Sequence, residues 1–192
     1  MGKNALFVLL MLLLGACSQP ALPKVEIESS MGTVVLEIDT IGAPLTGGNF
    51  LNLVDRGVYL NASFYRVVRP DNQDESPVKI EVVQAGLKDD GIIRNYPAIA
   101  HETTSQTGIK HRDGTLSMAR NQPGTASTEF FICIGDQPEL DFGGQRNPDG
   151  QGFAAFGEVV EGMDVIRQIQ QQADQGQYLL EPVQIYNIKR VK

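Results

Sequence analysis

The sequence predicts a mainly β domain with about eight antiparallel strands and two helices. Short runs of alternating apolar residues or β-formers recur along the chain, separated by clusters of Gly, Pro, Asn and Asp. Only two segments space their apolar residues as an amphipathic helix does. The chain has 192 residues, 42% hydrophobic and 20% charged, which is typical of a folded domain with one ordinary core. Strands in this number fit either a sandwich or a closed barrel, and the pattern alone favours neither.

The first elements of the domain are a predicted hairpin followed by a helix. Apolar and polar residues alternate in residues 24–30 and 33–39, and a Ser-Met-Gly turn joins the two runs. An amphipathic stretch follows Pro44. Its candidate N-cap is Thr46, and Gly57 suits the C-terminal end of the helix.

The third predicted strand carries an arginine among apolar residues. Residues 64–68 read Phe-Tyr-Arg-Val-Val, and the two-residue period of a strand places Phe64, Arg66 and Val68 on one face. An arginine with apolar neighbours on its own face is unusual. On this pattern alone, an edge-strand arginine that reaches solvent or pairs with a carboxylate is a sufficient explanation.

A polar loop over residues 71–77 leads to the fourth predicted strand, residues 78–85. The strand period places Ile80, Val82 and Gln84 on one face. By itself, a glutamine near a strand end indicates only a solvated side chain.

Residues 88–112 contain turn-forming residues and no regular apolar pattern, so they predict a long irregular segment. Both histidines, His101 and His111, lie there. Two histidines do not make a metal site, which needs three or four ligands, and we expect structural or solvated roles for them. Cys133, in a later apolar run, is expected to be a small buried hydrophobe.

Two further strands are predicted over residues 115–119 and 130–134, with a loop of defined turns over residues 120–128 between them. This loop is too long for a tight hairpin, and a long ordered loop between two strands more often has a function than not. Phe130 and Phe131 must point to opposite faces of their strand, so at least one of them is buried. The rest of the chain predicts a loop, a strand, a helix and a last strand, over residues 135–152, 153–160, 163–171 and 182–191.

The N-terminus has the pattern of a secretory signal. Lys3 precedes an unbroken apolar run over residues 5–14, too short for a stable membrane anchor, and small residues follow. The sequence Leu-Gly-Ala-Cys ending at Cys17 resembles a bacterial lipobox, in which the cysteine is lipidated and becomes the mature N-terminus. A plain signal peptide with a chance cysteine is the alternative. Ser18 resembles the pattern that is sorted to the outer membrane in Gram-negative cells.

These features divide the chain into a signal peptide (1–16), a lipidated N-terminus with a short tether (17–23) and one domain (24–192). We therefore expect an exported lipoprotein of a bacterial cell envelope, facing the periplasm or anchored in the outer membrane. Removal of residues 1–16 takes away Lys3 from 16 basic residues and none of the 23 acidic ones, which changes the net charge from −7 to −8. An acidic chain does not indicate a nucleic-acid partner.

The central stretch carries a family resemblance. Residues 116–119, 123–125 and 130–132 read Leu-Ser-Met-Ala, Pro-Gly-Thr and Phe-Phe-Ile, which in this order and spacing resemble the signature of the cyclophilin family of peptidyl-prolyl cis-trans isomerases. Phe-Tyr-Arg-Val-Val at 64–68 and Gln-Ala-Gly at 84–86 match the family as well. The resemblance covers nearly all of residues 24–192. It implies a closed eight-stranded antiparallel barrel capped by a helix at each end.

The resemblance also implies an activity and a site. It makes Arg66 the catalytic residue, with Gln84 holding the substrate backbone and orienting Arg66. The implied substrates are proline-containing polypeptides, here those of exported proteins, and the family needs no metal or cofactor. The positions that match the proline slot and its adjoining groove are Val82, Ala119, Arg120, Phe131, Leu140 and Phe153.

Several positions depart from the family. Val82 replaces a usual Met, Phe153 a common His or Tyr, Glu81 a Phe, and Glu139 a frequent Trp or Phe. Two carboxylates at the rim of the pocket suggest a preference for basic residues near the proline, and loss of the Trp implies weak cyclosporin binding. They also leave open a second function, a binding module or chaperone that holds proline segments with little turnover. The sequence does not indicate an oligomer.

Overall fold

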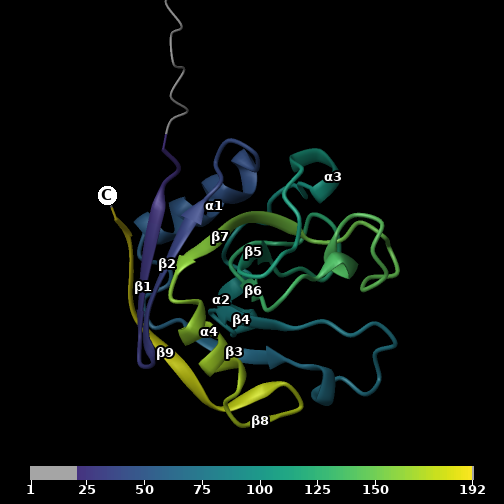
Figure 1. The fold of residues 1–192 in the computed structure, drawn as a ribbon. Helices are drawn as coiled ribbons and strands as arrows, with labels where there is room; N and C mark the ends of the chain where they lie inside the picture. The colour runs from purple at the N-terminus through teal and green to yellow at the C-terminus, as the bar shows by residue number, and fades with distance from the viewer. Residues whose placement is uncertain (1–20, 192) are drawn as a thin grey trace, which may run out of the picture.

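Eight antiparallel strands close into one barrel in the computed structural model, which describes residues 21–191 (Figure 1). The strands follow the order β1-β2-β7-β5-β6-β4-β3-β9, and β1 pairs with β9 to complete the barrel. This confirms the mainly β barrel. The strands are β1 (Lys24–Ser29), β2 (Gly32–Ile38), β3 (Ser63–Val68), β4 (Val82–Gly86), β5 (Thr115–Met118), β6 (Phe130–Cys133), β7 (Ala154–Glu161) and β9 (Tyr178–Val191), and the short β8 (Asp174–Gln175) forms a hairpin with β9.

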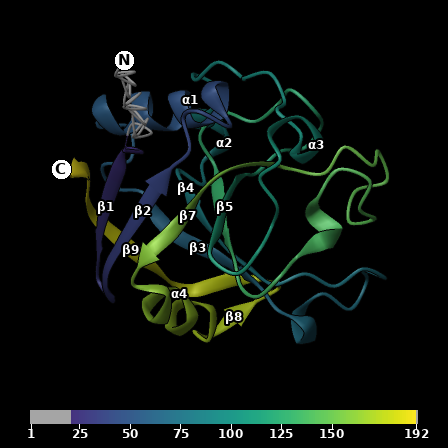
Figure 2. The ribbon, with the colours of Figure 1, turned by 45° about the horizontal axis from the view of Figure 1, so that its top comes forward.

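The two predicted helices, α1 (Pro44–Asp55) and α4 (Met163–Gln170), lie at opposite ends of the barrel, one above and one below in both views (Figures 1 and 2). Two one-turn helices, α2 (Asp90–Ile93) and α3 (Thr104–Thr107), were not predicted. They are too short to show a helical period and depend on capping side chains. Asp89, for example, accepts hydrogen bonds from the N–H groups of Gly91 and Ile92. Two 3-10 turns, η1 (Pro70–Asn72) and η2 (Pro138–Leu140), complete the elements.

The predicted N-cap of α1 is wrong. The helix begins at Pro44, with Ala43 as its N-cap, so Thr46 already lies inside the first turn. Proline fixes the backbone for this first position, which explains the earlier start. The side chain of Glu102 supplies the missing cap from 56 residues away, because its carboxylate accepts hydrogen bonds from the backbone N–H (2.7 Å) and the hydroxyl (2.6 Å) of Thr46. Gly57, with a positive φ of 67°, follows the helix as expected.

Gly48 in α1 is a position at which a substitution should stabilise the protein. A Cβ added at Gly48 would meet no atom within 4 Å. We expect Gly48→Ala to raise the free energy of unfolding by about 0.5–1 kcal/mol, because alanine has the higher helix propensity. A Cβ at the neighbouring Gly47 would lie 3.2 Å from the Asp39 carbonyl oxygen, so Gly47→Ala should gain less. Urea unfolding of both variants checks this, and equal gains would contradict it.

The barrel interior is filled by aromatic rings. Phe50 of α1 packs against Tyr59, Phe130 and Phe156, with ring centroids 5.2–5.5 Å apart. All four residues are fully buried, and the hydroxyl of Tyr59 donates to the carbonyl oxygen of Thr128 at 2.8 Å. These contacts fix α1 against the inner face of β6.

A smaller cluster lies apart from the main core. It consists of Val68, Ile80, Val82, Phe131, Cys133 and Leu140, with Ala119 and Phe153 packed against it. The predicted burial of the Cys133 thiol is confirmed, and burial raises its pKa.

The predicted shared face of Phe64, Arg66 and Val68 is wrong at Phe64. The pairing of β3 with β4 and with β9 shifts register between Phe64 and Arg66. A bulge of this kind reverses the side-chain alternation beyond it. Phe64 therefore belongs to the main core, whereas Val68 belongs to the smaller cluster and Arg66 borders a cavity.

Two strand boundaries also differ from the predictions. β4 begins at Val82, four residues later than expected, because the side chain of Gln73 replaces a strand partner for Ile80. Its Nε2 donates to the Ile80 carbonyl oxygen, and its Oε1 accepts from the Ile80 N–H. β9 begins four residues early, at Tyr178, because the hairpin with β8 extends it.

The predicted signal peptide, the lipidated Cys17 and the start of the tether lie outside the described residues. Within residues 21–191, no helix has both the length and the apolar character needed to cross a membrane.

Candidate active site

A cavity of about 540 Å³ opens beside the smaller cluster, on the outer face of β3, β4 and β6. All eight residues that the sequence assigned to catalysis or substrate binding line it: Arg66, Val82, Gln84, Ala119, Arg120, Phe131, Leu140 and Phe153. They come from six parts of the chain, in or next to β3, β4, β5, β6, η2 and β7, that only the closed barrel brings together.

The floor of this cavity is apolar. Val82, Phe131 and Leu140 are each at most 4% exposed, and Ile80 extends the same surface. The ring of Phe153 stands edge-on to that of Phe131, with centroids 5.3 Å apart and planes at 89°. A small apolar ring can displace water from such a slot with a favourable free energy.

Two amide oxygens hold the guanidinium of Arg66 at the edge of the slot. Nη1 donates to Gln84 Oε1 at 2.8 Å, while Nε and Nη2 donate to Gln177 Oε1 at 3.1 and 2.5 Å. No carboxylate among residues 21–191 lies within 4.0 Å of this guanidinium. The group is therefore fixed in orientation by neutral partners and keeps an uncompensated positive charge.

Sequence reasoning missed Gln177. It lies in the turn between β8 and β9, 111 residues from Arg66, and its Nε2 donates to the Asn72 carbonyl oxygen at 3.0 Å. No local pattern marks such a residue, because its importance comes from a contact between distant segments.

A chain of hydrogen bonds sets the orientation of the Gln84 amide. Gln84 Nε2 donates to the Tyr65 hydroxyl at 2.6 Å, and that hydroxyl donates to Glu129 Oε2 at 2.5 Å. Burial, followed by the nearby charge of Glu129, raises the pKa of Tyr65, so the hydroxyl stays protonated. With its nitrogen held by Tyr65, Gln84 presents its oxygen to Arg66. Tyr65 and Glu129 were not predicted as site residues, although Tyr65 lies within the 64–68 motif and Glu129 directly precedes the 130–132 motif.

Arg120 supports the cavity wall. Its Nη1 and Nη2 donate to the two carboxylate oxygens of Asp149 at 2.8 and 2.9 Å, and its Nε donates to the Gly152 carbonyl oxygen at 2.8 Å. The guanidinium lies 5.1 Å from the centre of the Phe153 ring. The side chain thus holds the 141–152 loop against the slot.

The ion pair of Arg120 and Asp149 should lose its stabilising effect at low pH. Hydrogen bonds from Arg120 lower the pKa of Asp149 from 3.8 to about 2. Since the folded pKa is depressed, the pair stabilises the loop above the ordinary pKa, and this contribution is lost as the pH falls toward the folded value. An NMR titration should show the Asp149 midpoint at about 2, and Arg120→Gln should return it toward 3.8. An unchanged midpoint in the variant would contradict this origin of the shift.

Ser117, His111 and Asp141 form a hydrogen-bonded row like that of a serine hydrolase. His111 Nδ1 lies 2.8 Å from Asp141 Oδ1, and Nε2 lies 2.9 Å from Ser117 Oγ. However, Ser117 is fully buried and His111 is 2% exposed, so no substrate reaches the hydroxyl. The imidazole stacks on Phe131 at 6.1 Å. His111 therefore has the expected structural role, supporting the slot from behind.

The hydrogen bonds among Ser117, His111 and Asp141 also favour the ionised form of Asp141. Burial of Asp141 opposes ionisation, but the hydrogen bonds from His111 outweigh it and lower the pKa of the Asp141 carboxyl.

In the described part of the chain, no three His, Cys, Asp or Glu side chains are grouped to hold a metal ion.

The expected acidic rim is not part of the cavity. Neither Glu81 nor Glu139 lines it. Glu81 Oε2 accepts from Gln170 Nε2 of α4 at 3.2 Å, and Glu139 Oε2 accepts from the Gln145 N–H at 2.8 Å. The hypothesis that these two carboxylates favour basic residues near the proline thus loses its structural basis.

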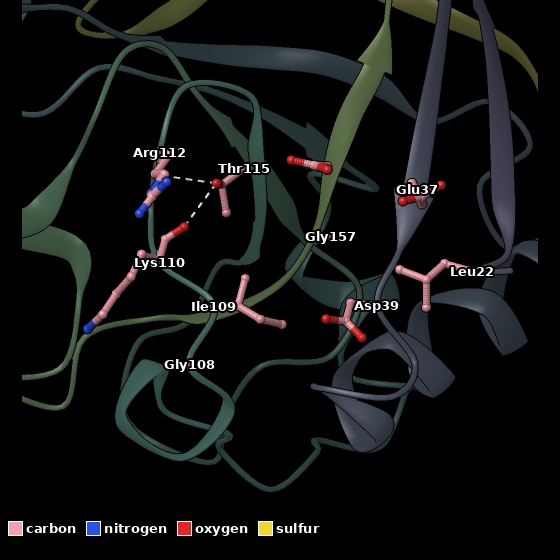
Figure 3. A pocket seen from close by; sticks show the side chains of 10 residues that line it. Leu22, Glu37, Asp39, Gly108, Ile109, Lys110, Arg112, Thr115 and Gly157 are labelled. Atoms are coloured by element: carbon pink, nitrogen blue, oxygen red, sulfur yellow. Dashed lines mark hydrogen bonds between the residues drawn. The ribbon is translucent and has the colours of Figure 1, made fainter. Parts of the chain in front are cut away.

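A second cavity, of about 260 Å³, lies between β2, β7 and the segment before β5 (Figure 3). Glu37 and Asp39 line one side, while Lys110 and Arg112 line another (Figure 3). The Thr115 hydroxyl donates to the Lys110 carbonyl oxygen and accepts from the Arg112 N–H, both at 3.0 Å. None of the predicted site residues lies here, so the candidate chemistry belongs to the larger cavity.

The barrel therefore carries an apolar slot with a fixed cation at its edge. The chain belongs to the cyclophilin family, because residues 24–190 match the family model described as cyclophilin type peptidyl-prolyl cis-trans isomerase/CLD. This confirms the resemblance seen in the sequence.

Curated relatives agree with this assignment, and a solved structure agrees with the fold. The chain is 32% identical to peptidyl-prolyl cis-trans isomerase B of Escherichia coli over 146 residues, which is 76% of this chain and 82% of the relative. It is 35% identical to peptidyl-prolyl cis-trans isomerase-like 1 of Neurospora crassa over 149 residues, 76% of this chain and 79% of the relative. A crystal structure of a Cryptosporidium parvum cyclophilin type isomerase matches the fold with a TM-score of 0.69 at 20% identity, covering 89% of this chain and 98% of that one.

Proposed function

We propose that the larger cavity accelerates rotation about Xaa-Pro peptide bonds, with Arg66 as the catalytic residue. The observation that carries the proposal is the guanidinium of Arg66, fixed at the edge of an apolar slot without a carboxylate partner. A related Cryptosporidium parvum isomerase was crystallised in the presence of the dipeptide Ala-Pro, which supports a proline-sized ligand for this kind of site.

The chemistry requires only differential binding. Rotation about the peptide C–N bond faces a barrier of about 18–20 kcal/mol, because the bond has partial double-bond character. In the twisted state the prolyl nitrogen becomes pyramidal and gains a lone pair. A guanidinium that donates to this nitrogen stabilises the twisted state more than either planar form, and so lowers the barrier.

The residues around Arg66 keep the reorganisation that accompanies this hydrogen bond small. Gln84 and Gln177 already hold the guanidinium in place, so little reorganisation accompanies the reaction. The proline ring lies in the slot formed by Val82, Phe131 and Leu140, which anchors one side of the rotating bond. Arginine suits the role because it remains protonated and its donors have fixed directions.

The test is NMR exchange spectroscopy on a short Xaa-Pro peptide with and without the protein. The proposal expects cis–trans exchange to accelerate at substoichiometric protein. Peptide binding without faster exchange would instead support the alternative of a proline-binding module with little turnover.

We further propose that the enzyme acts on exported proteins from a lipid anchor at Cys17. The apolar run over residues 5–14 and the lipobox-like sequence that ends at Cys17 support this. The lipid anchor would keep the domain close to the membrane, because the six tether residues 18–23 span about 20 Å when extended. Mass spectrometry of the mature protein should find residues 1–16 removed and Cys17 acylated, and Cys17→Ser should abolish acylation. An unmodified N-terminus at Met1 would overturn this location.

A further inference from the structure

We propose that Arg146 and Asn147 form a carboxylate subsite in the cavity wall, which makes the enzyme favour proline segments with Asp or Glu near the proline. The proposal rests on the isomerase function above and names a substrate class for that site. It reverses the charge preference suggested by Glu81 and Glu139.

Arg146 is a half-buried cation with only neutral partners. It lines the same cavity as Arg66. Its Nη1 donates to Gln73 Oε1 at 2.9 Å, to the Ser76 hydroxyl at 2.6 Å and to the Val78 carbonyl oxygen at 2.5 Å. These bonds join the 141–152 loop to the loop between β3 and β4; both loops extend from the same side of the barrel (Figure 1).

The charge of Arg146 is not compensated within the described residues. No carboxylate in residues 21–191 lies within 4.0 Å of it. Burial, and then the nearby charge of Arg66, lower the pKa of the Arg146 guanidinium. A desolvated cation beside a second cation is unfavourable, and an incoming anion would relieve both effects.

The other charged groups at the cavity are already engaged or lie in solvent. Arg120 is paired with Asp149, and Lys88 lies 5.9 Å from the centre of the Tyr178 ring. Glu129 accepts from the Tyr65 hydroxyl and from the Leu87 N–H. Asp90 is exposed at the start of α2. Glu129 has only neutral partners as well, so the partly buried charges in the cavity without an opposite partner are the anion Glu129, beside Tyr65, and the two cations Arg66 and Arg146.

A second donor beside Arg146 lacks an acceptor. Asn147 Nδ2 is the one buried side-chain nitrogen or oxygen without a hydrogen-bond partner in the described part of the chain, and Asn147 also lines the cavity. Buried polar groups are nearly always paired, so an unpaired donor next to a cation that has no carboxylate partner points to a ligand with acceptor oxygens. A carboxylate satisfies both, through charge-assisted hydrogen bonds.

Long-range electrostatics do not explain a preference for peptides with Asp or Glu near the proline. The chain has a net charge of −7, which repels acidic peptides at a distance. A preference for acidic substrates therefore has to arise locally, at Arg146 and Asn147, and has to disappear with them.

The experiment measures kcat/KM for acetylated and amidated peptides with Glu, Gln or Lys at each of the two positions on either side of one proline. We expect the wild-type protein to favour Glu over Lys by about tenfold at the best position, the effect of one charge-assisted contact. Arg146→Gln should remove most of this ratio. Asn147→Asp, which places a carboxylate beside Arg146, should lower it as well and tests the subsite should Arg146→Gln fail to fold. Arg112→Gln removes the same charge outside the cavity and should leave the ratio unchanged.

The outcomes separate the two proposals. If the wild-type protein accelerates none of the peptides, the isomerase function is wrong. If it accelerates the Glu and Lys peptides equally, or if the Glu preference survives in both cavity variants, only the carboxylate subsite is wrong. Loss of the preference in Arg112→Gln would assign it to overall charge instead.

Discussion

Replacing Arg66 with alanine is expected to lower kcat/KM for a proline peptide by about 10²–10³-fold, the loss that follows removal of one preorganised transition-state donor. The effect should be mainly on kcat, because the donation is made only when the prolyl nitrogen becomes pyramidal. Peptide binding, measured by chemical-shift titration, should weaken less, since the apolar slot at Phe131 remains. NMR exchange spectroscopy measures the turnover and the chemical-shift titration measures the peptide binding, both on the same samples.

Two controls make this prediction specific to the guanidinium. Arg66→Lys keeps the charge but loses the fork that Gln84 and Gln177 hold, so its activity should fall between wild type and Arg66→Ala. Arg112→Ala removes an arginine that lines the second cavity instead of the larger one and should have wild-type activity. Full activity in a folded Arg66→Ala protein would rule out the proposed mechanism.

The largest expected effect on stability is at Phe130. Phe130→Ala should lower the free energy of unfolding by about 3–5 kcal/mol, as large-to-small changes in a packed core do. Its ring is fully buried in the barrel, 5.3 Å from the ring of Phe50 and 5.7 Å from that of Tyr59. The rings of Phe50 and Tyr59 are held between α1 and β6, so they cannot move to fill the cavity that the substitution leaves. Chemical denaturation measures the loss.

The next residue provides a matched comparison. Phe131 has the same side chain but faces the other side of β6, toward the cavity. Phe131→Ala should cost less stability than Phe130→Ala, because its ring borders open space on one side. It should reduce proline-peptide turnover strongly, since the slot loses its floor. If the two variants lost stability equally and both kept activity, the assignment of the two faces would be wrong.

The sequence predicted most of the strands because alternation is a local signal. It also selected eight residues that line one cavity, because the family resemblance assigns their positions. It left open which of Phe130 and Phe131 faces the core, since alternation says only that they differ. It misplaced Phe64, because a bulge depends on how β3 pairs with β4 and leaves no trace in the alternation itself.

Residues that act across long stretches of sequence were not predictable. Glu102 caps α1 and Gln177 holds Arg66 through contacts 56 and 111 residues apart. Arg146 lies in a segment whose Gly, Pro and Asn content predicts only a surface loop. Its place in the cavity follows from contacts with Gln73, Ser76 and Val78, which only the folded barrel supplies.

The pairing of β1 with β9 also determines when the protein can become active. Lys24 pairs with Val191, so during synthesis the first strand of the barrel lacks its β9 partner until the last strand has been made. Until β9 arrives, both β1 and β3 lack a neighbour and expose unpaired backbone groups to other chains. The turn that supplies Gln177 arrives with β9, so the grip on Arg66 is completed in the same late step. We therefore expect a chain that lacks β9 to have neither the closed barrel nor the fully held Arg66, and so no isomerase activity.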